Sequence, residues 1–294
     1  MLGRAIHLAT GLPPLWALSL VSWVSFLFAL PLLGDEFRAR LGAKRSHGPL
    51  PYFLLYPVAF FFAAPYTESL YLLLVLLAFR EIRLGRPLAA IGAGFLLGLT
   101  RAPAAAVGPA LALAFLGREG RPRRAASAAT AAALACAPVA GVLAYTFGIG
   151  WLKGEPGLFF RSMSAWAHRT TSPGAGIVSF VREPVDLFLS GHFLRHPGAL
   201  APFAHFVLFG ILAVLQVRRR RWSDAAWTLG VLGLSFLTGT SAGVPRYTAT
   251  VFPGFVLLFE LFEDRPRARA AVLALSAALL LLHAAFFVNW HFVS

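Results

Sequence analysis

Residues 63–79 read AAPYTESLYLLLVLLAF, and Glu68 is the one charged residue in this stretch. It follows Pro65, at the point where a polar turn gives way to an uninterrupted apolar run. The run predicts a helix in an apolar environment, and Pro65 suits the first turn of that helix because its missing N–H is not needed there. The positive end of the helix dipole favours a carboxylate at this position. One such helix is compatible with several folds, and recurrence of such apolar runs along the chain would indicate a membrane protein.

They recur along the whole chain. Of the 294 residues 58% are hydrophobic and 13% charged, the mean hydropathy is +0.72, and apolar runs extend from Leu15 to Trp290. A water-soluble globule cannot bury this much apolar surface. The sequence therefore predicts a single all-α polytopic membrane domain over residues 1–294, with about ten membrane segments at 15–34, 51–64, 66–79, 87–99, 104–116, 127–147, 198–217, 224–240, 250–262 and 271–290.

The excess of positive charge is concentrated in loops. The formal net charge is +14, and most Lys and Arg residues fall in five loops, at 38–45, 80–86, 118–124, 218–221 and 265–269. If each segment crosses once, these loops share one face, which the positive-inside rule makes cytoplasmic. Both termini and the long stretch 148–197 then lie outside. The charge indicates contact with anionic membrane lipids, and no nucleic-acid-binding motif accompanies it.

Two pairs of segments are short and have a polar break between them. A 14-residue helix reaches only ~21 Å against a hydrocarbon core of ~30 Å. The breaks are Pro65-Tyr66-Thr67-Glu68 and Thr100-Arg101-Ala102-Pro103, and we expect both in a shared recess open to the outer face, since such backbone is tolerated where it lines a cavity. Glu68 is then either a helix-start acid at the interface or a carboxylate that binds a substrate hydroxyl or pairs with Arg101.

Three stretches resemble one known family. YPVAFFFAAPYTESLYLLLVLLAF at 56–79 resembles the signature of PIG-V-like GPI mannosyltransferases and their bacterial relatives, GLTRAPAAAVGPAL at 98–111 their Leu-Thr-Arg-Pro-type turn, and VPRYTATVFPGFVLL at 244–258 their late Arg-Tyr turn. Order and spacing agree over roughly residues 15–290. The Tyr-Thr-Glu-Ser-Leu element is the most specific of the three.

The resemblance implies a GT-C membrane glycosyltransferase. Such an enzyme transfers mannose from a polyprenyl or dolichyl phosphate carrier to a lipid-linked or glycan acceptor on the non-cytoplasmic face of a bacterial plasma membrane, or of the endoplasmic reticulum in a eukaryote. It implies no cofactor. Glu68 becomes the candidate catalytic carboxylate, and the candidate substrate-binding residues are Tyr66, Thr67, Ser69, Arg101, Trp166, His168, Arg169, Arg246 and Tyr247. Trp166, His168 and Arg169 are equally typical of a headgroup-level anchor.

The chain departs from the family pattern at its beginning. Family members carry a Trp-Asp element in an outer loop, and no Trp-Asp dipeptide occurs in this sequence. Asp35 and Glu36 are no substitute, since they adjoin Arg38 in a loop assigned to the cytoplasm. We expect either a start codon upstream of this sequence, or a degenerate or truncated paralogue whose catalytic base is missing or is replaced by Glu68.

Two other classes of function stay open. A transporter of lipid-linked sugars also needs broken helices and interior charges, although an inverted repeat is not evident. A non-catalytic partner subunit that binds a polyprenyl chain would lack the base. His192 and His196 have helical i, i+4 spacing but no acidic companion, so no metal site is predicted.

Overall fold

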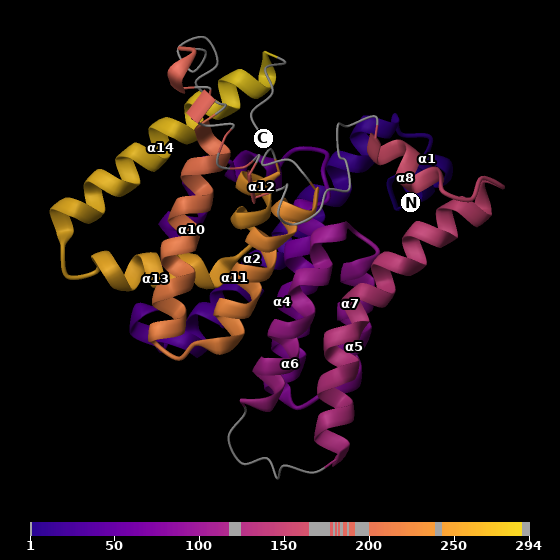
Figure 1. Cartoon of the computed structure of the whole chain (residues 1–294), viewed down its shortest axis with the longest axis horizontal. Coiled ribbons are helices and arrows are strands. Elements are labelled where there is room, and N and C mark those ends of the chain that lie inside the picture. Colours follow the sequence, from indigo (N-terminus) through magenta and orange to yellow (C-terminus); the bar gives the residue numbers. More distant parts are fainter. Residues whose placement is uncertain are drawn as a thin grey trace.

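The computed structural model describes residues 2–117, 125–164, 200–238 and 243–289, with 177, 178, 180, 182, 185, 186 and 188–191. Within these residues the chain is all-helical and contains no strand, which confirms the predicted fold class (Figure 1). The helices are α1 (Leu2–Thr10), α2 (Pro14–Leu41), α3 (Leu50–Leu54), α4 (Glu68–Leu84), α5 (Pro87–Gly98), α6 (Gly108–Leu116), α7 (Ala125–Leu152), α8 (Leu158–Ser164), α10 (Ala201–Arg218), α11 (Trp222–Thr238), α12 (Val244–Ala249), α13 (Phe252–Phe262) and α14 (Pro266–Val288), with 3₁₀ turns η1 (Ala43–Arg45), η2 (Ala59–Phe62) and η3 (Ala102–Val107).

Four helices are long and apolar enough to cross a membrane. They are Pro14–Leu41, Ser127–Leu152, Ala201–Arg218 and Pro266–Val288. The prediction of about ten membrane segments is not confirmed, because the other apolar helices are shorter. α4, with 17 residues, spans only ~26 Å.

Residues 51–64 do not form the continuous segment that the hydropathy predicts. The stretch contains α3 and η2, separated by a turn at Pro57. Proline lacks the N–H that a continuing helix needs and disfavours helical backbone in the residue before it. The helix therefore stops, and the chain enters the polar break in 3₁₀ and turn conformations.

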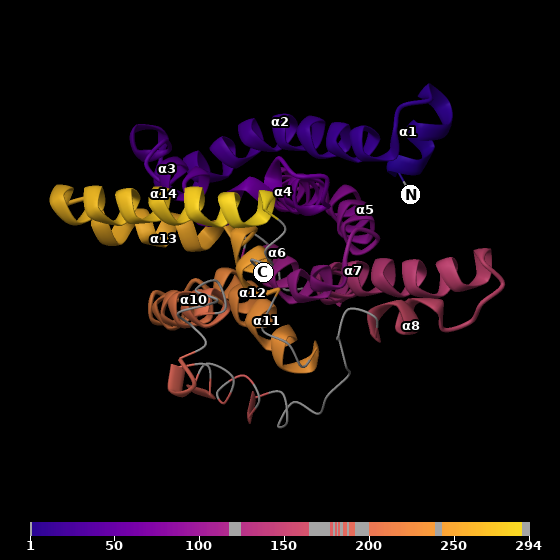
Figure 2. The ribbon, with the colours of Figure 1, turned by 90° about the horizontal axis from the view of Figure 1, so that it is seen from above.

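α4 occupies the centre of the helix assembly. It packs against α2 on one side and α5 on the other, and Figure 2 shows it beneath the long α2. Tyr71, Leu72, Val75 and Leu76 of α4 are buried in the hydrophobic core. The two ends of α4 therefore lie at opposite sides of this core.

Close backbone packing joins α5 to α7. A Cβ atom on Gly98 would lie 2.1 Å from the carbonyl oxygen of Pro138, and one on Gly141 would lie 2.1 Å from that of Phe95. Only glycine permits this approach. The contact fixes α5, and with it the turn that carries Arg101.

Candidate functional site: a buried carboxylate between two arginines

The polar break before α4 is held by side chains from two helices. The Ser22 hydroxyl of α2 donates to the Tyr66 carbonyl at 2.7 Å, and the Trp23 indole N–H donates to the Ala63 carbonyl at 2.8 Å. The Ser69 hydroxyl donates to the Phe62 carbonyl at 2.6 Å. These bonds replace the helical hydrogen bonds that the break lacks, as a buried backbone requires. They fix the position at which α4 begins.

Glu68 is the first residue of α4 and is fully buried. Its Oε1 lies 2.9 Å from Nη1 of Arg101, 2.7 Å from Nε of Arg246 and 2.5 Å from Nη2 of Arg246. Arg101 precedes η3 and Arg246 belongs to α12, so the contact joins three segments far apart in the sequence. The structure thus brings together the three charged residues that the sequence predicted for one site. We call them the Glu68 cluster.

The second carboxylate oxygen of Glu68, Oε2, accepts no hydrogen bond from the described residues. This oxygen is buried. A buried acceptor without a donor costs free energy, so a native protein normally satisfies it with a partner, a water or a ligand. Oε2 can therefore accept one further hydrogen bond from a hydroxyl.

Aromatic rings support both guanidinium groups. The guanidinium carbon of Arg246 lies 4.4 Å from the ring centroid of Tyr66 and 4.7 Å from that of Phe61. That of Arg101 lies 5.0 Å from the ring of Tyr247 and 5.9 Å from that of Tyr71. Such cation–π contacts fix the orientation of a guanidinium group without neutralising its charge.

The cluster carries an excess positive charge on its more accessible side. Two guanidinium groups face one carboxylate, so one positive charge is not balanced within the cluster. The side chain of Glu68 is 0% exposed, that of Arg101 12% and that of Arg246 21%. Arg246 is thus the most accessible of the three charged groups, and its guanidinium group lies against the exposed ring of Tyr66.

The other predicted site residues have different placements. Tyr66 and Tyr247 contact the two arginines, whereas Ser69 is buried and its hydroxyl is committed to the Phe62 carbonyl. Thr67 is the N-cap residue of α4, is exposed, and makes no capping hydrogen bond with its side chain. Trp166, His168 and Arg169 lie outside the described residues, as do His192 and His196.

Four contributors to the site were not predicted: Ser22, Trp23, Phe61 and Tyr71. Ser19, Ser22 and Ser25 recur every third residue within the apolar α2, and all three are buried. Polar residues at this spacing share one helix face. This spacing marks a polar face of α2 in the sequence, but it does not indicate which segment that face contacts.

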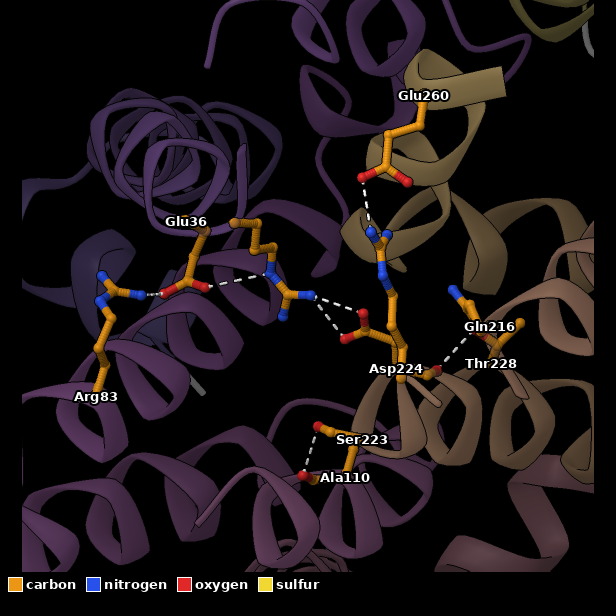
Figure 3. A network of polar contacts seen from close by, with 10 residues as sticks. Glu36, Arg83, Ala110, Gln216, Ser223, Asp224, Thr228 and Glu260 are labelled. Carbon is orange, nitrogen blue, oxygen red and sulfur yellow. Dashed lines mark hydrogen bonds and ion pairs between the residues drawn. The ribbon is translucent and has the colours of Figure 1, made fainter. Parts of the chain in front are cut away.

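A second group of charges, which includes two buried carboxylates, lies at the opposite end of α4 (Figure 3). Glu36 contacts Arg83 through Oε1 and Arg40 through Oε2 at 3.7 Å, and Nη1 of Arg40 donates to both carboxylate oxygens of Asp224 at 2.8 Å. We call Glu36, Arg40, Arg83 and Asp224 the Asp224 network. The assignment of Glu36 to a loop was wrong, because α2 continues to Leu41 and Glu36 is buried within it.

Ion pairs also connect the basic loops to one another. Arg219 and Arg221 both bind Glu260 of α13, and Arg45 binds Glu263. Together with the Asp224 network, these contacts place four of the five basic loops at one end of the structure. Residues 118–124, the fifth loop, are outside the described part of the chain.

Comparisons with protein-family models, with curated proteins and with solved structures found no match. The described part of the chain is all-helical, with several helices apolar and long enough to cross a membrane and with a Glu–Arg–Arg cluster around a buried carboxylate at a polar break.

Proposed function

We propose that this chain is a membrane glycosyltransferase of the GT-C type. It transfers a hexose, mannose by the resemblance of its sequence motifs, from a polyprenyl or dolichyl phosphate to a lipid-linked or glycan acceptor. The observation that carries this proposal is that Arg101 and Arg246 both contact Oε1 of Glu68. Glu68 and Arg101 belong to the two polar breaks, and Arg246 belongs to α12. This set of groups fits a phosphate and a hydroxyl at the same time.

The chemistry assigns a task to each charged group. The acceptor hydroxyl attacks the anomeric carbon of the sugar, the bond from that carbon to the phosphate oxygen breaks, and the phosphate leaves with the electron pair. Negative charge therefore develops on the phosphate, where the forked guanidinium groups of Arg101 and Arg246 stabilise it. The hydroxyl proton passes to a base, and Oε2 of Glu68 is the free acceptor within the cluster.

The test is hexose transfer by the full chain in vesicles that contain radiolabelled polyprenyl phosphate mannose and an extracted lipid acceptor. Arg246→Ala should abolish transfer, whereas Arg246→Lys should retain part of it because one cationic donor remains. Asp224→Asn is the matched control, since it breaks a buried ion pair at the other end of α4 and should leave transfer intact. Equal transfer by the wild type and by Arg246→Ala would refute the proposal.

A non-catalytic, polyprenyl-binding partner subunit is the second candidate. The observation that favours it is that Oε1 of Glu68 already holds both arginines, while the sequence has no Trp-Asp element to supply another base. This subunit would bind polyprenyl phosphate with the same dependence on Arg246 but would transfer no sugar. A transporter would instead move the lipid-linked sugar between leaflets, which a flux assay in the same vesicles detects.

A further inference from the structure

The turn after α10 contains an arginine in an unusual backbone conformation. Arg220 has a φ of 58°, and among the described residues it is the one non-glycine residue with positive φ. Its N–H donates to the Val217 carbonyl and the N–H of Arg221 donates to the Gln216 carbonyl, both at 2.9 Å. This pair of bonds is a Schellman motif, which places Arg220 at the position where glycine is preferred.

α4 ends in the same motif and uses glycine. Gly85 has a φ of 81°, its N–H donates to the Ile82 carbonyl at 3.1 Å, and the N–H of Arg86 donates to the Glu81 carbonyl at 2.9 Å. The two turns have the same hydrogen-bond pattern, so the difference lies in the residue and not in the geometry. A left-handed backbone costs free energy for arginine that it does not cost for glycine. We therefore expect an interaction of the Arg220 side chain that compensates for this cost.

Ion pairs with the described residues do not compensate for this cost. Arg219 and Arg221, on either side, both bind Glu260, whereas Arg220 is exposed and makes no ion pair with any described residue. The helix dipole is not the reason either, because Arg218 and Arg219 already place positive charge at the end of α10.

Arg220 belongs to a larger group of exposed cations near the ends of α10 and α14. The ion pairs of Arg219 and Arg221 with Glu260, and of Arg45 with Glu263, bring three turns together. Figure 1 shows the α13–α14 turn at the far left and the α10–α11 turn lower down. These pairs use both glutamates, and Asp264 is the remaining acid in these turns. The exposed cations of the same turns that make no ion pair with described residues form what we call the basic patch: Lys44, Arg218, Arg220, Arg265 and Arg267.

We propose that the basic patch binds the phosphates of anionic phospholipids in the adjacent membrane leaflet, and that Arg220 is kept in a strained conformation for this contact. The patch lies at the ends of α10 and α14, two helices long and apolar enough to cross a membrane, and therefore at headgroup level. Arginine suits a phosphate because its planar fork donates two parallel hydrogen bonds. Lysine and arginine close to an anionic surface add to membrane attraction one by one.

The experiment compares thermal unfolding of the full chain in nanodiscs of phosphatidylcholine and of phosphatidylglycerol. Arg220→Gly removes the charge and the strain together. In phosphatidylcholine it should unfold at a higher temperature than the wild type, whereas the increase that phosphatidylglycerol gives the wild type should be smaller in this variant. Arg220→Lys keeps the charge and should retain most of that increase.

Two controls separate a defined patch from diffuse positive charge. Arg80→Gln removes one exposed arginine at the same end of the structure, but Arg80 is paired with Glu81, which also contacts Arg86. This variant should respond to phosphatidylglycerol as the wild type does, whereas the triple variant Arg218→Gln, Arg265→Gln, Arg267→Gln should lose most of the response.

Three results would overturn the proposal. They are an equal response to phosphatidylglycerol in the wild type and in Arg220→Gly, an equal loss in Arg80→Gln, and an equal increase when sodium phosphate is added to phosphatidylcholine nanodiscs at constant ionic strength. The last would show that free phosphate, and not a lipid surface, is the ligand.

Discussion

The two ends of α4 carry two clusters of charge that contain buried carboxylates but differ in stoichiometry. In the Asp224 network, Glu36 and Asp224 face Arg40 and Arg83, and all four carboxylate oxygens have a cationic partner within 4 Å. In the Glu68 cluster, one carboxylate faces two arginines and one of its oxygens has no partner among the described residues. The charges of the Asp224 network are therefore balanced, two against two, whereas the Glu68 cluster has one positive charge in excess.

This difference separates a structural contact from a candidate binding site. The Asp224 network pairs each carboxylate oxygen with a cation and leaves no acceptor open to a ligand, although Nε of Arg40 has no hydrogen-bond partner among the described residues. Its effect is therefore to join α2, α4 and α11. The Glu68 cluster keeps a positive charge and an acceptor that none of the described residues satisfies, so it can take a ligand. Counting charges and acceptors at each end therefore tells more about function than burial alone, because both glutamates are buried.

The largest expected effect comes from removing the single anion of the unbalanced cluster. Glu68→Gln leaves two largely buried guanidinium groups without a counter-ion, and breaking a buried pair in this way costs about 3–5 kcal/mol of unfolding free energy. Unfolding of the detergent-solubilised protein with increasing sodium dodecyl sulfate measures the loss.

The matched control for Glu68→Gln is Glu263→Gln, whose pair with Arg45 is partly exposed and should contribute only about 0.2–1 kcal/mol. Added pyrophosphate should restore part of the lost stability in Glu68→Gln and not in Glu263→Gln. Equal losses in the two variants would mean that the two arginines do not depend on Glu68.

The next effect concerns binding more than stability. Arg246→Ala leaves Glu68 paired with Arg101, so the protein should stay folded, but the unbalanced charge is gone. We expect affinity for polyprenyl phosphate to fall at least about tenfold, which corresponds to about 1.4 kcal/mol. Titration calorimetry in detergent measures this, and unchanged affinity would exclude the cluster as the anion site.

The central part of this site could be predicted from the sequence, and its supports could not. Glu68, Arg101 and Arg246 stand out because they are charged residues at turns between apolar runs, a pattern visible in one dimension. That Ser22 and Trp23 hold the Tyr66 turn depends on α2 crossing the break, which no local pattern encodes.

The error at Glu36 has a related cause. The predicted segment ended at residue 34 because Asp35 and Glu36 are charged, yet α2 continues to Leu41. Asp35 is half exposed and pairs with Arg38, whereas Glu36 finds partners on α4 and on its own helix. A buried charge is tolerated where partners from distant segments meet it, and hydropathy alone cannot show those partners.

A smaller effect is expected in the balanced network. Asp224→Asn removes one of the two anions, but Arg40 keeps Glu36 at 3.7 Å, so the loss should be about 1–3 kcal/mol. The same detergent unfolding experiment measures it. Affinity for polyprenyl phosphate should not change, and a parallel loss of affinity would show that the two clusters are coupled through α4.

The smallest effect tests how the break is held. Ser22→Ala removes the hydrogen bond to the Tyr66 carbonyl, which should cost about 0.5–1.5 kcal/mol. Ser19→Ala is the control, because the Ser19 hydroxyl donates to the Leu15 carbonyl of its own helix and to no other described residue, and it should change stability by no more than about 0.5 kcal/mol. Since Tyr66 lies against the guanidinium group of Arg246, Ser22→Ala should also weaken polyprenyl phosphate binding slightly, whereas Ser19→Ala should not. Loss of stability without any loss of affinity would show that the unbalanced cluster keeps its geometry independently of α2.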